Sequence, residues 1–168
     1  PARRTPPLRQ LLLAVGIFLL AETTAAPEQV HSRLSVDRLD SLYYGSCLAQ
    51  GRPAPILDTL LARDPGVFVF AGDNVYADSR MPWRIRRAYE RLAERDDFRR
   101  LRDTATLLPT WDDHDYGEND AGTGFPVKQE SERIFETFWG FPESHPIRNR
   151  PGIYHAVEAG PQGQRVQI

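Results

Sequence analysis

The sequence predicts an α/β fold, in which short strands alternate with amphipathic helices and functional residues follow the strand ends. Residues 67–71 form an all-apolar run typical of a buried strand. A polar cluster follows this run directly, and a second cluster follows residues 106–110. Because ligands of open α/β sheets bind where the carboxyl ends of strands meet, we expect both clusters in one crevice.

The first half of the chain contains one strand and one helix before this buried strand. Residues 39–44 are expected to form a short strand that leads into Gly45 and Cys47. Residues 55–63 carry leucines and an isoleucine at helical spacing, and the Asp64-Pro65-Gly66 turn ends this helix. The order strand, helix, strand is typical of a parallel sheet.

Two further helices are expected after the buried strand. Residues 81–96 place apolar side chains on one face and arginines on the other. We interpret the arginine face as solvated, because Glu90 and Glu94 are interleaved with it; the alternative is an anion site. Residues 98–102 are expected to add a short helical turn before the strand that ends at Thr110.

The last third of the chain predicts a helix and a hairpin. Residues 127–139 place aromatic side chains on one stripe of a helix that ends at Gly140. Residues 152–158 alternate as a strand does, a Gly-Pro-Gln-Gly turn follows, and residues 164–168 begin the return strand. Because the sequence stops inside that strand, we interpret it as a fragment of a longer protein.

The amino end has the pattern of a secretory signal peptide over residues 1–26. Arginines precede an apolar stretch at residues 11–21, and small residues follow it. The stretch is short for a membrane span, which needs about 20 residues. An uncleaved anchor is the alternative, and Arg3-Arg4 is a weak match to a twin-arginine signal. We therefore expect the protein to be secreted or exported to the periplasm, and residues 27–168 to belong to the mature domain.

Composition limits the remaining function classes. The formal net charge is −2, so no basic surface for nucleic acid is indicated. The single cysteine, Cys47, excludes an internal disulfide framework. We therefore expect a soluble domain, a monomer without a stable membrane partner, that depends on a packed core.

The first polar cluster combines a carboxylate with a phenol. Gly72 allows a sharp turn after the strand, and Asp73 lies at the strand's end. Tyr76 returns to the same point if residues 73–76 form one tight turn. Carboxylate and phenolate suit Fe³⁺ or a similar ion. A Gly-Asp turn after a strand is also common without any function.

The second cluster contains Asp112, Asp113 and Asp115 within four positions. Carboxylates this close raise one another's pKa and destabilise the fold unless a cation is present. A bound metal ion is the simplest remedy, and a solvated acidic loop is the alternative. His114 lies between them as a ligand or a proton donor. Cys47 follows a strand in the same way, either as an inert buried thiol or as a metal-bound thiolate.

Together these motifs resemble the PhoD-like alkaline phosphatase and phosphodiesterase family, within the calcineurin-like metallophosphoesterases. The matching segments run from about Leu42 onwards: Gly45 to Cys47, Gly72 to Asp78, Thr110 to Gly117, Asn119-Asp120, the Lys128 and Ser131 helix, and Gly152 to Tyr154. The resemblance implies a layered α-β-β-α sandwich, of which this chain is an amino-terminal part truncated at its carboxyl end. It also implies export and two or more metal ions, Fe³⁺ with Ca²⁺ or another divalent ion.

The resemblance also implies a role for individual residues. Asp73 matches an aspartate that bridges two metals, and Tyr76 a phenolate ligand of iron. Cys47 matches a thiolate ligand. Asp113 matches a ligand of the second metal, and His114 a histidine that stabilises the transition state or protonates the leaving group. Further plausible ligands or supporting groups are Asn119, Asp112 and Asp115.

The resemblance implies hydrolysis of phosphate monoesters or diesters by metal-activated water. The later histidine ligands of the superfamily have no counterpart, because His145 and His155 occur in unrelated contexts, as surface or structural residues. The fragment alone is therefore expected to have little activity. A secreted metal- or ligand-binding module without turnover is the main alternative, and a hydrolase of other esters is a third.

Overall fold

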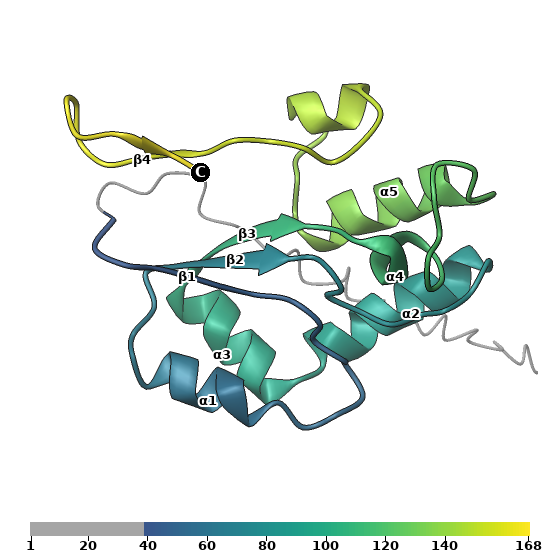
Figure 1. The fold of residues 1–168 in the computed structure, drawn as a ribbon, viewed down its shortest axis with the longest axis horizontal. Helices are drawn as coiled ribbons and strands as arrows, with labels where there is room; N and C mark the ends of the chain where they lie inside the picture. Colours follow the sequence, from purple (N-terminus) through teal and green to yellow (C-terminus); the bar gives the residue numbers. More distant parts are fainter. Residues whose placement is uncertain (1–38) are drawn as a thin grey trace, which may run out of the picture.

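The computed structural model describes residues 39–168 (Figure 1). The expected signal peptide at residues 1–26 lies outside the described residues. The elements, in chain order, are β1 Leu42–Gly45, α1 Pro55–Leu61, β2 Val67–Ala71, α2 Pro82–Ala93, α3 Asp96–Thr104, β3 Thr106–Thr110, α4 Asp113–Tyr116, α5 Lys128–Phe138, the 3₁₀ helix η1 Pro146–Asn149, β4 Glu158–Ala159 and β5 Val166–Gln167.

The first three strands form a parallel sheet in the order β1-β2-β3. Helix α1 connects β1 to β2, and α2 and α3 connect β2 to β3. Because all three strands run in the same direction, their carboxyl ends meet at one edge of the sheet. The predicted α/β class is confirmed at this level, and the four-layer sandwich stays a prediction.

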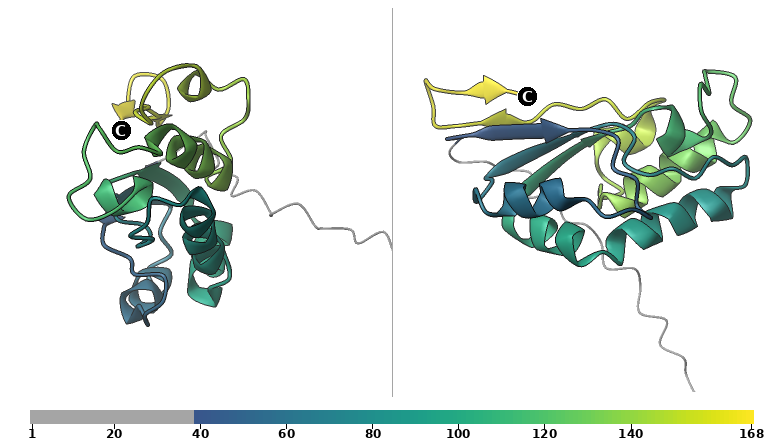
Figure 2. Two further views of the ribbon diagram at one scale, coloured as in Figure 1. Left: turned by 90° about the vertical axis from the view of Figure 1, so that its right-hand side faces the viewer. Right: turned by 60° about the horizontal axis from the view of Figure 1, so that its bottom comes forward.

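The two faces of the sheet have different coverings. Phe68 and Phe70 of β2 pack into the main core with apolar side chains of all the long helices. Val67 and Leu108 point to the other face, where they pack with Val157, next to β4. Period-two alternation therefore divides the strand side chains between the helix-side core and the smaller cluster around Val157. In Figure 2, α1 and α3 lie on one side of the sheet and the C-terminal hairpin lies on the other.

The main core is rich in aromatic rings that fix the helices against the sheet. Trp139, at the end of α5, is fully buried and lies 5.1 Å from Phe70 and 6.0 Å from Phe98, measured between ring centroids. Tyr89 of α2 lies 4.7 Å from Phe138 of α5. The aromatic stripe predicted for residues 127–139 is thus the face of α5 that holds β2, α2 and α3 together.

Several element boundaries differ from the sequence expectations. Helix α3 covers Asp96–Thr104 instead of one turn, because Phe98 and Leu101 bury an apolar face. Helix α4, in the second motif, was not predicted, and neither was η1. The prediction of a strand over residues 152–158 was wrong for most of that range, because β4 covers only Glu158–Ala159. Across residues 39–168, no helix is long and apolar enough to cross a membrane.

Candidate metal centre

The three motifs that the sequence singled out follow the ends of three adjacent parallel strands. Cys47 follows β1, Asp73 follows β2 and Asp113 follows β3. Backbone hydrogen bonds join the first two loops: Cys47 N donates to Gly72 O at 3.2 Å, and Leu48 N donates to Asp73 O at 2.9 Å. These motifs therefore lie at the same edge of the sheet, and the crevice that was expected to hold them stays a prediction.

Gly72 permits the close approach of the second and third loops. Its φ is +97°, a conformation that side chains disfavour. A Cβ added there would lie 2.8 Å from Cβ of Asp112. Asn74 also connects these two loops, because its side-chain nitrogen donates a hydrogen bond to Thr110 O at 2.7 Å.

At this junction, Asp73, Asp113 and His114 can hold a metal ion. Each offers one ligand atom, and these atoms all lie within 4.8 Å of one another. We call these three residues the carboxylate–histidine cluster. They come from two loops that are separated in sequence but meet at neighbouring strand ends. The family resemblance implies metal binding by Asp73 and Asp113, and for His114 it implies stabilisation of the transition state or protonation of the leaving group; the motif itself also left His114 open as a ligand.

Two further predicted ligands contact Asp73. The thiol of Cys47 donates to Oδ2 of Asp73 at 3.6 Å, and the phenol of Tyr76 donates to the same oxygen at 3.1 Å. Two acidic protons therefore point at one carboxylate oxygen. A cation placed there would replace those protons and convert both side chains to anionic ligands.

The other oxygen of Asp73 provides a direct test of whether a metal fits. Oδ1 is buried and has no hydrogen-bond partner among the residues that the structure describes. A buried carboxylate oxygen without a partner is unfavourable, because it has lost its hydration. A metal ion at the carboxylate–histidine cluster would supply the missing interaction, so the residues present fit a cation.

The backbone around the cluster is conformationally strained. Cys47, Asp73 and Asp78 have φ of 60°, 52° and 44°, in the left-handed region. Asp120, in the loop beyond α4, has φ of 59°. Non-glycine residues in this region are uncommon, and such strain concentrates at functional sites.

Tyr76 is a neutral phenol in this arrangement. Burial, together with hydrogen bonds and charge from Cys47 and Asp73, raises its pKa far above the ordinary value. Gln50 fixes the backbone of this residue, because it accepts from Tyr76 N and donates to Tyr76 O, both at 2.9 Å. No sequence pattern indicated this role for Gln50, which lies in the loop after β1.

The imidazole of His114 has one contact at a ring nitrogen and another with a neighbouring aromatic ring. Nδ1 lies 2.7 Å from Oδ1 of Asp78, and the Tyr76 ring lies 4.3 Å from the imidazole between centroids. Burial lowers the pKa of His114, but the carboxylates of Asp78, Asp73 and Asp113 outweigh it and bring the pKa above its ordinary value. Asp78 lies within the matching segment Gly72 to Asp78, but no role was predicted for it.

The three carboxylates of the second motif have separate surroundings, which corrects the expectation that they repel one another in one place. Asp112 is the N-cap of α4 and accepts from Asp113 N at 2.9 Å. Asp113 alone joins the carboxylate–histidine cluster. Asn119 is exposed, and its side chain donates to Asp120 at 2.6 Å. Its predicted role as a ligand stays a prediction.

Asp115 is a buried structural acceptor. Its Oδ1 accepts from the backbone N–H groups of Asn74 and Val75 and from the hydroxyl of Tyr89, and its Oδ2 accepts from Asp112 N. Burial raises the pKa of Asp115 to about 7, against the effect of these donors. The side chain thereby joins the second loop, the third loop and helix α2.

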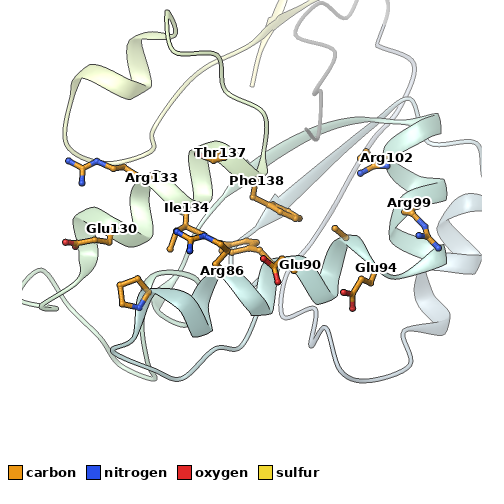
Figure 3. A pocket seen from close by; sticks show the side chains of 13 residues that line it. Arg86, Glu90, Glu94, Arg99, Arg102, Glu130, Arg133, Ile134, Thr137 and Phe138 are labelled. Carbon is orange, nitrogen blue, oxygen red and sulfur yellow. The ribbon is translucent and has the colours of Figure 1, made fainter. Parts of the chain in front are cut away.

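A cavity between the helices lies apart from the carboxylate–histidine cluster. It has a volume of about 570 Å³ and is lined by residues of α2, α3 and α5, among them Arg86, Ile134 and Phe138 (Figure 3). Tyr89 lines it and also donates to Asp115 at 3.0 Å. The cavity therefore borders the scaffold of the site, while its lining contains none of the predicted site residues.

Comparisons of the chain with protein-family models, curated proteins and solved structures gave no significant match.

Proposed function

We propose that this chain belongs to a metal-dependent hydrolase of phosphoric esters. The observation that carries the proposal is the cluster of Asp73, Asp113 and His114 at the ends of β2 and β3, with Cys47 and Tyr76 directed at Asp73. Hard oxygen ligands with a nearby imidazole suit hydrolysis assisted by metal ions. The motif resemblance to PhoD-like phosphatases narrows the proposed substrate to phosphate monoesters or diesters.

The proposed cofactors are Fe³⁺ and a divalent ion such as Ca²⁺. Cys47, Asp73 and Tyr76 would hold the iron, and Asp113, with Asn119 nearby in sequence, would hold the second ion. When bound, such ions polarise phosphoryl oxygens and activate water for attack on phosphorus.

His114 is the proposed proton donor to the leaving oxygen. Its pKa lies above the ordinary value, so the protonated form persists nearer neutral pH. General-acid catalysis of this kind contributes roughly 10²–10⁴-fold. The contribution depends on the leaving group: an alkoxide needs a proton, whereas nitrophenolate departs without one.

The test compares Asp113→Ala with His114→Gln in the full-length protein supplied with iron and calcium. Asp113→Ala should lower both metal content and hydrolysis. His114→Gln should keep its metal and lose activity mainly on alkyl phosphates, with little loss on nitrophenyl phosphate. Equal losses on both substrates with metal retained would exclude His114 as the general acid, and metal loss in His114→Gln would make it a ligand.

The same preparation tests the metal and the alternatives. An iron site with Tyr76 and Cys47 should give a visible charge-transfer band that Tyr76→Phe shifts or abolishes. A colourless, fully active protein would refute the iron assignment. Metal binding without turnover on phosphate monoesters and diesters would favour the binding module. Turnover on carboxylic esters alone would indicate the hydrolase of other esters.

A further inference from the structure

The cavity between α2, α3 and α5 has the size and the lining of a small-molecule binding site. Its volume is about 570 Å³, and pockets that bind small molecules typically measure roughly 300–1,000 Å³. Its apolar lining includes Tyr89 of α2 and Ile134 and Phe138 of α5. Such pockets usually combine apolar walls with a few polar groups that orient the ligand. A ligand of this cavity would therefore have an apolar body.

The charged residues at the two ends of the cavity have acidic neighbours on their own helices. Figure 3 shows Arg133 and Glu130 at one end, three residues apart on α5, which makes them neighbours on the helix surface. Arg99 and Arg102 lie at the other end, and each pairs with an aspartate of α3. The positive charge at either end is thus partly balanced within the protein.

Arg86 of α2, towards the middle of the cavity in Figure 3, differs from these arginines. It is exposed and has no ion pair among the residues that the structure describes. The nearby carboxylates of Glu90 and Glu94 pair instead with Arg87, at 3.2 and 2.9 Å, and Arg87 does not line the cavity. An arginine guanidinium binds a carboxylate or a phosphate through parallel N–H donors. Arg86 therefore complements an anionic group placed above the apolar lining.

We propose that this cavity binds an amphipathic anion, with its carboxylate or phosphate head at Arg86 and its apolar body against Tyr89, Ile134 and Phe138. The site is the anion site that the sequence left open as an alternative for the arginine face of residues 81–96, confined to one arginine. It is independent of the proposed hydrolase function, because none of the predicted site residues lines the cavity.

Calorimetric titration of the full-length protein tests both halves of the ligand. Decanoate carries a carboxylate and an apolar chain, 1-decanol lacks the charge, and acetate lacks the chain. Decanoate should bind at least about 10-fold more tightly than either, because a hydrogen bond to a charged group contributes about 1.5–3 kcal/mol. Equal affinity for decanol would overturn the anionic head. Absence of decanoate binding, as when another part of the full-length chain covers the cavity, would overturn the whole proposal.

Decylphosphonate distinguishes the two kinds of head, because it has no ester bond that a phosphatase could hydrolyse. The probe whose binding depends more strongly on Arg86 identifies the head as a carboxylate or a phosphate-type group. If neither probe's binding depends on Arg86, the assignment of the head to this residue is wrong.

Arg86→Gln removes the charge at the centre of the cavity. It should weaken decanoate binding about 10- to 100-fold and leave decanol binding unchanged. Arg91→Gln is the matched control, because Arg91 is another exposed arginine of α2 that does not line the cavity. Equal losses in both variants would mean a general attraction of anions to the helix, which would contradict a site at Arg86.

Ala93→Leu tests the apolar part of the same site. Ala93 is partly exposed and lines the cavity, so a leucine there should occupy ligand space while the helix is kept. Binding of decanoate and of decanol should both weaken, with the thermal unfolding temperature unchanged. Unaltered affinities would place the ligand elsewhere and overturn the proposal.

The same variants separate this inference from the proposed function. A carboxylate could also bind metal at the carboxylate–histidine cluster, but that binding would not depend on Arg86 or Ala93. Arg86→Gln should retain the metal content and the hydrolytic rate of the unaltered protein. If the protein hydrolyses no phosphate ester, the proposed function fails, and the titrations still decide whether the cavity binds an amphipathic anion.

Discussion

Gly72 is the residue on which the approach of the second and third loops depends. Its backbone has φ of +97°, and the position of a Cβ is already taken by Asp112. Without this approach, Asp73 and Asp113 would not lie within ligand distance of one another. The sequence indicates only that Gly72 forms a turn. The structure shows that a glycine is also needed there so that the second and third loops can pack together.

Gly72→Ala should destabilise the chain by about 2–5 kcal/mol. A left-handed alanine costs about 1–2 kcal/mol, and overpacking against Asp112 adds about 1–3 kcal/mol. Gly163→Ala is the control, because Gly163 has φ of +88° with nothing within 4 Å of its added Cβ. Urea unfolding of both variants measures the difference. Equal losses would mean that the contact with Asp112 contributes nothing.

Arg95, the N-cap of α3, and Asp97, in the first turn of α3, hold the loop that follows β1. Arg95 donates to both oxygens of Asp97, at 2.9 and 2.5 Å, and to the carbonyl of Arg52 at 2.5 Å. The Asp97 carboxylate also accepts from Phe98 N at the first turn of α3. Because Gln50 of the same loop holds the backbone of Tyr76, this pair connects the helical layer to the candidate site.

Asp97→Asn should destabilise the chain by about 1–2 kcal/mol at pH 7, since the bond between two charged, largely buried groups is lost. Burial raises the pKa of Asp97, but Arg95 outweighs it and the net pKa lies below its ordinary value. A lowered folded-state pKa gives stability that is present above about pH 4 and lost as the pH falls further.

Urea unfolding at pH 7 and pH 3 checks this prediction. The difference between the unaltered chain and Asp97→Asn should shrink at the lower pH. Asp96→Asn is the control, because the Asp96 side chain is 87% exposed in the same turn and should matter little at either pH. An undiminished difference at pH 3 would show that Asp97 acts through packing instead of charge.

At the scale of the molecule, a parallel sheet lies between a helical layer and the C-terminal hairpin (Figures 1 and 2). This arrangement leaves the carboxyl ends of β1, β2 and β3 at one edge, where the candidate site forms. The exported location that the sequence predicts for the whole protein is a separate matter, because it depends on residues 1–26.

The predicted signal peptide can be tested on the secreted or periplasmic protein. Mass spectrometry should find a mature chain that begins near Pro27, because small residues precede that position after the apolar stretch. A mature chain that retains residues 11–20 would contradict cleavage and favour the membrane anchor. Expression of residues 27–168 alone, which should stay inside the cell, is the control.

The sequence by itself determined the α/β class, the buried strand β2 and the identity of the motifs at strand ends. These features are local: an apolar run, a helical stripe or a Gly-Asp turn is visible within a few consecutive residues. The predicted helix over residues 127–139 agrees closely with α5 for the same reason. Its aromatic stripe is long and regular, so its period is unambiguous.

Only the tertiary structure decided how the acidic residues divide their roles. Asp112 caps α4, Asp115 is buried under four donors, and Asp113 faces Asp73 and His114. Three aspartates within four positions look alike in sequence, because what distinguishes them is the set of donors supplied by distant segments. Folding likewise brings Asp78 to His114, which lies 36 residues away in the chain.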